Sequence, residues 1–140
     1  MSQYLLDTDT LSLIQQGNAI VLQNVNRRVI TDIRLSVITI WEQMQGWQGW
    51  ITSARDRVQL ANAHALMVKR LLPTWCRFSV ISFSEPAILR FEHLRSLRLN
   101  VGPMDLRIGA IALEEGLTVV TRNLRDFGRI PGLTVEDWAI

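Results

Sequence analysis

The chain has 140 residues, 48% of them hydrophobic, which predicts one compact domain over residues 1–140 with a buried core. Its formal charge is only +2, yet Lys69 is its single Lys and every other basic residue is Arg. Arg suits phosphate contacts, although a general bias towards Arg gives the same composition. The sequence has no apolar run long enough for a membrane span, no signal-peptide pattern and one cysteine, Cys76, expected to be a packing residue, so we expect a cytoplasmic protein.

Short apolar runs alternate with helical patterns along the chain. The runs near 3–6, 35–40, 78–83 and 117–121 are rich in Val, Ile and Leu and predict buried parallel strands, and 133–136 is a candidate last strand. The helical patterns cover 52–72, with Ser53 and Asp56 as a capping box, then Pro86 to about Leu99, and Asp105 to Glu115. This order predicts an α/β fold with a central parallel sheet flanked by helices.

Four acidic residues lie near the predicted strand ends: Asp7, Glu42, Asp105 and Asp126. The carboxyl ends of parallel strands share one edge of a sheet, so these acids are expected to converge there. A cluster of carboxylates repels itself unless it holds protons or cations, and oxygen ligands favour Mg²⁺ or Mn²⁺. The four acids are therefore the candidate catalytic and metal-binding residues.

Each acid also has a simpler explanation. The simpler role for Asp7 is to cap the helix that follows the first strand, but Thr8 or Asp9 can cap it instead, which leaves Asp7 for the site. Asp9 is expected to cap this helix or to make a supporting hydrogen bond, so Asp9→Asn is expected to be nearly silent. Glu42 and Asp105 both suit the start of a helix. Asp126 is a candidate for an ion pair with a neighbouring Arg, at position 122 or 125.

Several stretches resemble PIN-domain toxins of the VapC type. They are residues 5–9, 36–42, 101–110, 119–127, 130–133 and 136–138, and the resemblance covers essentially the whole chain in the right order. It implies a PIN-like fold, Mg²⁺-dependent endoribonuclease activity on RNA, a cognate antitoxin and a homodimer. It gives the four acids the places of the family's acidic quartet, with Asn123 able to share or replace the role of Asp126. Asp9 departs from the Asn that is common there.

The surroundings of the predicted site supply further candidates. Thr8, Thr121 and Asn123 are expected to orient the ligands, and Arg107, Arg122 and Arg125 are expected to hold backbone phosphates of the substrate. Trp47 and Trp50 stand beside glycines and predict an exposed groove where an antitoxin segment docks.

Two alternatives belong to other classes of protein. Asp7 and Asp9 also resemble the nucleophile and acid–base pair of haloacid-dehalogenase-type phosphatases. That chemistry needs a downstream Lys and a Gly-Asp pair, but Lys69 lies on a predicted helix and no Gly-Asp pair occurs. A non-catalytic, Arg-rich RNA-binding module is the other alternative, and the four matching acids argue against it.

Overall fold

The structure is a computed structural model that describes residues 2–140 and contains a five-stranded sheet in the order β3-β2-β1-β4-β5. The strands are β1 (Tyr4–Leu6), β2 (Ile33–Ser36), β3 (Ser79–Ile81), β4 (Thr118–Val120) and β5 (Val135–Glu136). Every neighbouring pair is parallel. The prediction of a central parallel sheet is confirmed.

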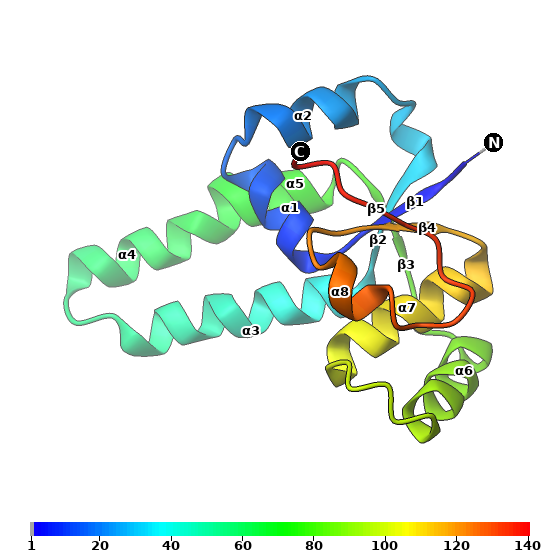
Figure 1. Cartoon of the computed structure of the whole chain (residues 1–140). Coiled ribbons are helices and arrows are strands. Elements are labelled where there is room, and N and C mark those ends of the chain that lie inside the picture. Colours follow the sequence, from blue (N-terminus) through cyan, green and yellow to red (C-terminus); the bar gives the residue numbers. More distant parts are fainter. Residues whose placement is uncertain (1) are drawn as a thin grey trace.

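Helices surround this sheet (Figure 1). They are α1 (Thr8–Gln15), α2 (Ala19–Asn26), α3 (Val37–Ser53), α4 (Arg57–Leu66), α5 (Leu72–Trp75), α6 (Glu85–Ser96), α7 (Pro103–Glu115) and α8 (Leu124–Phe127). A 3₁₀ turn, η1 (Ile30–Asp32), precedes β2, and a π-helical segment, η2 (Met67–Leu71), joins α4 to α5. Among residues 2–140, no helix combines the length and the apolar character that a membrane crossing needs.

The second predicted strand is too long. Ser36 ends β2 and caps α3, because its side chain accepts a hydrogen bond from the backbone N–H of Thr39. Residues 37–40 are therefore helical despite their β-branched side chains. The Ser36 cap gives a hydrogen-bond partner to one of the N–H groups that have none at the start of a helix. As a result, Glu42 lies inside α3 and not after a strand.

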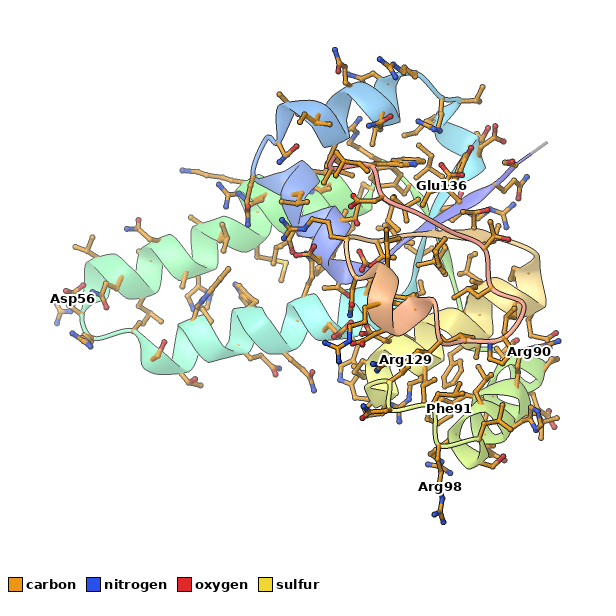
Figure 2. All side chains as sticks on the ribbon, in the orientation of Figure 1. Asp56, Arg90, Phe91, Arg98, Arg129 and Glu136 are labelled. Atoms are coloured by element: carbon orange, nitrogen blue, oxygen red, sulfur yellow. The ribbon has the colours of Figure 1, made fainter. Side chains whose placement is uncertain are left out.

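The predicted helix over 52–72 is wrong as a single element. Its first residues end α3, and Asp56 starts α4 by accepting a hydrogen bond from the N–H of Gln59 at 2.8 Å. The helix then widens into η2 before Pro73. Proline has no N–H to bond the carbonyl four residues earlier, and a π turn is one way for a helix to accommodate that loss. Figure 1 shows α3 and α4 side by side as a hairpin projecting from the sheet, and Asp56 lies at its tip (Figure 2).

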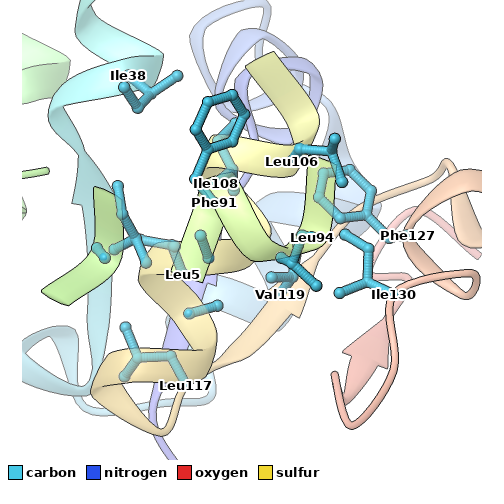
Figure 3. Close-up of a cluster of buried hydrophobic side chains, with 14 of the residues drawn as sticks. Leu5, Ile38, Phe91, Leu94, Leu106, Ile108, Leu117, Val119, Phe127 and Ile130 are labelled. Atoms are coloured by element: carbon cyan, nitrogen blue, oxygen red, sulfur yellow. The ribbon is translucent and has the colours of Figure 1, made fainter. Parts of the chain in front are cut away.

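Two hydrophobic clusters cover the two faces of the sheet. Leu5 and Val119 belong to the cluster formed with α6, α7 and α8 (Figure 3), whereas Leu6 and Val120 belong to the one formed with α1 and α2. Successive strand residues point to opposite faces, so a short all-apolar strand fills both clusters at once. The central strands, β1 and β4, are thereby fixed from both sides, and so are the residues that follow them.

Candidate active site

The site lies where the strand order reverses. The strand β1 pairs with β2 on one side and with β4 on the other, so the chain winds outward in both directions from β1. In an open parallel sheet, such a switch point leaves a crevice outside the carboxyl ends of the two strands. Asp7 follows β1 directly and Thr121 follows β4 directly, so both lie at this crevice.

Asp7 has two roles in the local structure. Its side chain is only 5% exposed, and Oδ1 accepts a hydrogen bond from the N–H of Thr10 at 2.8 Å, which makes Asp7 the N-cap of α1. The expectation that Thr8 or Asp9 would cap this helix is wrong. Burial raises the pKa of Asp7, while hydrogen bonds from Thr121 and Thr10 act in the opposite direction. Capping engages one carboxylate oxygen, so it does not exclude a second role for the other.

Glu42 reaches the crevice from the first part of α3. The hydroxyl of Thr8 donates a hydrogen bond to Oε1 of Glu42 at 2.6 Å, and the hydroxyl of Thr39 lies 3.1 Å from that of Thr8. Thr8 begins α1 and Thr39 is buried in α3, so this chain of contacts links the two helices. It also fixes the direction of the Glu42 carboxylate.

Asp105 comes from the first turn of α7, after the Gly102-Pro103 turn that the sequence singled out. A methyl group at Gly109 would lie 2.6 Å from Cδ1 of Ile130, so the glycine allows α7 to approach this side chain closely. The pKa of Asp105 is raised to about 6, first by burial and then by the negative charges of Glu42, Asp7 and Asp126. The four predicted acids therefore act on one another electrostatically.

Three of these acids line a single open pocket of about 560 Å³. Its lining residues are Asp7, Thr8, Asp9, Ser12, Glu42, Asp105, Arg122 and Asn123. Together with Asp9, the pocket has four carboxylates and one guanidinium, that of Arg122, so it attracts cations. Asp126 does not line the pocket. It accepts hydrogen bonds from Nδ2 of Asn123 at 2.9 Å and from Arg129 at 3.3 Å, so its predicted pairing with Arg122 or Arg125 is wrong.

The acids are of the ligand type that Mg²⁺ prefers, although they are not already arranged around a common ion position. Among residues 2–140, no three His, Cys, Asp or Glu side chains are arranged to hold an ion between them. Mg²⁺ does not need such a cage, because it keeps several waters and commonly binds one or two carboxylates together with a substrate phosphate. The carboxylate oxygens of Asp7, Glu42 and Asp105 in this pocket suit that mode of binding.

Curated proteins of the VapC type match part of the sequence. A tRNA(fMet)-specific endonuclease VapC from Salmonella typhimurium is 58% identical over 66 residues, which cover 44% of this chain and 50% of that protein. Ribonuclease VapC2 from Rickettsia felis is 36% identical over 66 residues, covering 44% of this chain and 49% of that protein. The chain thus spans about half the length of the curated relatives it matches. No family model matches the sequence.

Solved structures match nearly the whole chain. A chain of the DNA-bound VapBC from Salmonella typhimurium has a TM-score of 0.79 and 26% identity, and the match covers 99% of both chains. The fold is that of the VapC-type PIN domains. A chain of FitAcB from Neisseria gonorrhoeae gives a TM-score of 0.74 at 24% identity, covering 96% of this chain and 97% of that one, which supports the fold alone.

Within this VapC-type fold, the three candidate phosphate-binding arginines have different surroundings. Arg122 lines the acidic pocket, where Nε and Nη2 donate to the two carboxylate oxygens of Asp9 at 2.7 and 2.9 Å. The guanidinium of Arg107 lies over the rings of Phe91 and Trp41, at 4.6 and 5.7 Å. Arg125 is exposed on α8. Only Arg122 is placed by the fold at the acids themselves.

The predicted tryptophan groove is present and adjoins the acidic pocket. It measures about 220 Å³ and shares Thr8, Ser12 and Glu42 with that pocket. Trp47 and Trp50 both line it, but they differ. Trp47 donates a hydrogen bond from Nε1 to the carbonyl of Ala63 at 2.9 Å and so ties α3 to α4, whereas Trp50 is 54% exposed.

A partly buried polar network in the wall of the groove was not predicted from the sequence. Gln43 and Gln15 exchange two amide hydrogen bonds, at 2.8 and 2.9 Å, and Nε1 of Trp75 donates to Oε1 of Gln43 at 2.7 Å. These bonds connect α1, α3 and α5, which are remote in sequence. The one local indication of them is Gln43, a polar residue on the buried face of α3, because buried polar groups generally have hydrogen-bond partners. Cys76, expected to be a packing residue, is exposed.

Proposed function

We propose that this chain is an Mg²⁺-dependent endoribonuclease that hydrolyses RNA phosphodiesters, and that it is the toxin of a toxin–antitoxin pair. One observation carries the proposal. Asp7, Glu42 and Asp105 reach one pocket from three separate elements, and burial together with the charges of Glu42, Asp7 and Asp126 raises the pKa of Asp105 to about 6. Acids that are held together despite their mutual repulsion are typical of functional sites, and neither the helix cap made by Asp7 nor the Thr8 contact of Glu42 requires Asp105 to lie beside them. The named activities of the matching VapC proteins support the same reading.

In this proposal the four acids divide the work between binding and proton transfer. Asp7 and Asp105 hold the ion directly, while Glu42 and Asp126 complete the site directly or through water, and one of them accepts the proton of the attacking water. Asn123, which lines the pocket and bonds Asp126, shares the role of that acid. A bound Mg²⁺ would lower the pKa of water and offset negative charge that develops on the phosphate. Mn²⁺ would serve the same donors.

Three neighbouring side chains orient these acids. Thr8 donates to Glu42, Asn123 donates to Asp126, and the Thr121 side chain favours the ionised form of Asp7 by lowering its pKa. Hydrogen bonds of this kind keep a carboxylate in one orientation and so reduce the freedom that ion binding has to remove. For the substrate, we propose Arg107, Arg122 and Arg125 as contacts to backbone phosphates.

The proposal also names partners. The toxin reading requires an inhibitor, and we propose that an antitoxin segment buries Trp50 in the groove beside α3 and α4, from which a basic side chain can reach the acids. VapBC complexes among the matching structures support a partner of this kind. A homodimer and a cytoplasmic location belong to the same proposal.

The haloacid-dehalogenase alternative is disfavoured by one contact. An acid–base Asp two residues after the nucleophile must exchange a proton with the substrate. Asp9 instead points both carboxylate oxygens at Arg122. A trapped phosphoryl group on Asp7 would nevertheless establish that chemistry.

The deciding experiment combines cleavage with growth. Purified wild-type chain should cut single-stranded RNA when Mg²⁺ is added, and Asp7→Asn or Asp105→Asn should lower the rate by roughly two orders of magnitude or more while the fold persists. Expression of the wild type should arrest growth, and co-expression of a neighbouring antitoxin gene should restore it. Arrest that persists with Asp7→Asn would reject the ribonuclease-toxin proposal and favour the RNA-binding module.

A further inference from the structure

Asp9 and Arg122 form an ion pair across the mouth of the acidic pocket. Asp9 lies in the first turn of α1 and Arg122 in the loop after β4, 113 positions later, and two parallel hydrogen bonds of 2.7 and 2.9 Å join them. Both residues line the pocket that contains Asp7, Glu42 and Asp105. The pair therefore belongs to the site by position, although the four-acid chemistry does not use it.

Stability is a poor explanation for this pair. The two side chains are 51% and 49% exposed, and exposed ion pairs contribute little to folding because water and salt screen them. What a bidentate pair does provide is direction. It holds a long, mobile side chain in one plane, so that the guanidinium is already ordered before anything binds to it.

The ordered guanidinium still has donors to offer. Arginine carries five N–H bonds, and Asp9 takes one from Nε and one from Nη2, which leaves three. Arg122 is also the one cationic residue among the eight that line the pocket. A phosphodiester that approaches Asp7, Glu42 and Asp105 is repelled, and the guanidinium of Arg122 in the same pocket offers it a positive partner.

We propose that Arg122 binds a backbone phosphate of the substrate at the mouth of the acidic pocket, and that Asp9 is its positioning residue. This inference rests on the proposed function, since it names the contact through which that site holds its RNA. It assigns Asp9 a task that replaces the expected helix cap. It also predicts that Asp9→Asn is not silent.

Steady-state cleavage of a short single-stranded RNA with Mg²⁺ tests the proposal in four variants: Arg122→Ala, Arg122→Lys, Asp9→Asn and the double variant Asp9→Asn with Arg122→Ala. Arg122→Ala should raise KM about tenfold or more, as loss of a hydrogen bond to a charged group does. Asp9→Asn should raise KM roughly two- to tenfold, which is the effect of leaving one long side chain unordered. The double variant should be no worse than Arg122→Ala, because Asp9 acts only through Arg122.

The salt dependence of RNA binding separates a phosphate contact from a change in fold. Measured with Mg²⁺ in a cleavage-deficient Asp105→Asn background, the slope of log affinity against log salt should fall by about 0.7 when Arg122 becomes Ala, and it should be kept with Lys. Arg90→Ala is a matched control, because Arg90 makes an equally short 2.7 Å pair with Glu114 on α6 and α7, at the far end of the molecule from the α3–α4 hairpin (Figure 2). It should change neither KM nor slope.

The outcomes distinguish this inference from the proposed function. An unchanged KM and slope in Arg122→Ala, with normal cleavage by the wild type, overturns the inference and leaves the ribonuclease intact. An additional loss from Asp9→Asn in the absence of Arg122 overturns the positioning role of Asp9. Absence of cleavage by the wild type overturns the proposed function, and the binding slope then still reports whether Arg122 contacts phosphate.

Discussion

The charge of Asp105 affects folding as well as the proposed chemistry. In the folded protein its carboxylate is partly buried beside three other acids, so the ionised form is disfavoured and the pKa rises from 3.8 to about 6. A group with a raised folded pKa stabilises the fold at low pH, where it is protonated in both states. That contribution is lost as the pH increases from about 4 through about 6.

We therefore expect Asp105→Asn to stabilise the metal-free protein at neutral pH. Asn keeps the shape of the side chain and removes the charge, so the melting temperature in a chelator should rise by about 2–4 °C near pH 7.5, a small shift because water partly screens the site. The gain should shrink as the pH falls and vanish below pH 3.8, where Asp105 is protonated in both the folded and the unfolded protein. The exposed Glu92→Gln on α6 serves as the control and should show no such pH-dependent gain. A gain of equal size at neutral pH and below pH 3.8 would contradict the electrostatic origin.

Thr8 offers a second test at the level of one side chain. Its hydroxyl donates to Glu42 at 2.6 Å, so Thr8→Val keeps the volume and removes the bond. We expect the Mg²⁺ affinity to fall roughly tenfold or more, the usual effect of losing a residue that orients a ligand. Thr8→Ser retains the hydroxyl and should bind Mg²⁺ like the wild type, as measured by calorimetric titration. Equal affinity in Thr8→Val and wild type would exclude Glu42 from the ion site.

The elements differ in how far the sequence could predict them. Short apolar runs found the strands, because a strand buried on both faces has no polar positions. The end of α7 was equally clear, since Gly116 follows its last residue with φ of 66°, whereas the helix starts at Pro103, before the predicted Asp105. The boundary at Ser36 was missed because the β-branched residues after it favour a strand locally, and the cap that makes them helical is a single hydrogen bond.

The site divides in the same way. Asp7 and Asp105 were predictable, because each follows a local signal, a strand end or a turn, that brings it to the sheet edge. The partners of Asp9 and Asp126 were not. Asp9 pairs with a residue 113 positions away, and whether Asp126 faces Arg125 or Arg129 depends on the single turn of α8. Ion pairs between exposed residues depend on how segments far apart in the sequence pack together, and no local sequence pattern shows this.

The hairpin of α3 and α4 allows stability and partner binding to be separated. Trp47 bridges the two helices through its bond to Ala63, so Trp47→Ala should lower the melting temperature by several degrees, as loss of a large packed side chain does. Trp50 is 54% exposed, so Trp50→Ala should leave stability within about 0.5 kcal/mol, a usual range for surface substitutions. If Trp50 is the proposed anchor, the same variant should weaken antitoxin binding roughly tenfold or more. An unchanged antitoxin affinity in Trp50→Ala would show that the antitoxin does not bind in this groove.

At the scale of the whole molecule, the site is the meeting point of segments with little local reason to meet. The acids come from the ends of β1 and from α3, α7 and α8, and two hydrophobic clusters on opposite faces of the sheet hold these elements together. Burial of apolar side chains in these clusters supplies the free energy that brings the acids together, and the repulsion between the carboxylates reduces it. A cation in the pocket relieves this opposition, so ion binding and global folding are coupled.

Mg²⁺ should therefore raise the melting temperature of the wild type, and the rise should grow with the logarithm of the ion concentration above Kd. At an ion concentration of about 100 times Kd, binding to the native state alone adds about 2.7 kcal/mol of stability, an effect that thermal unfolding measures readily. Asp7→Asn should show a much smaller rise. Asn is as good a helix cap as Asp, so α1 should keep its start, and the lost response then reports the missing carboxylate and not a damaged fold. Glu92→Gln should respond like the wild type. An equal rise in Asp7→Asn would place the stabilising ion outside the acidic pocket, because the variant lacks one of the carboxylates proposed to hold it.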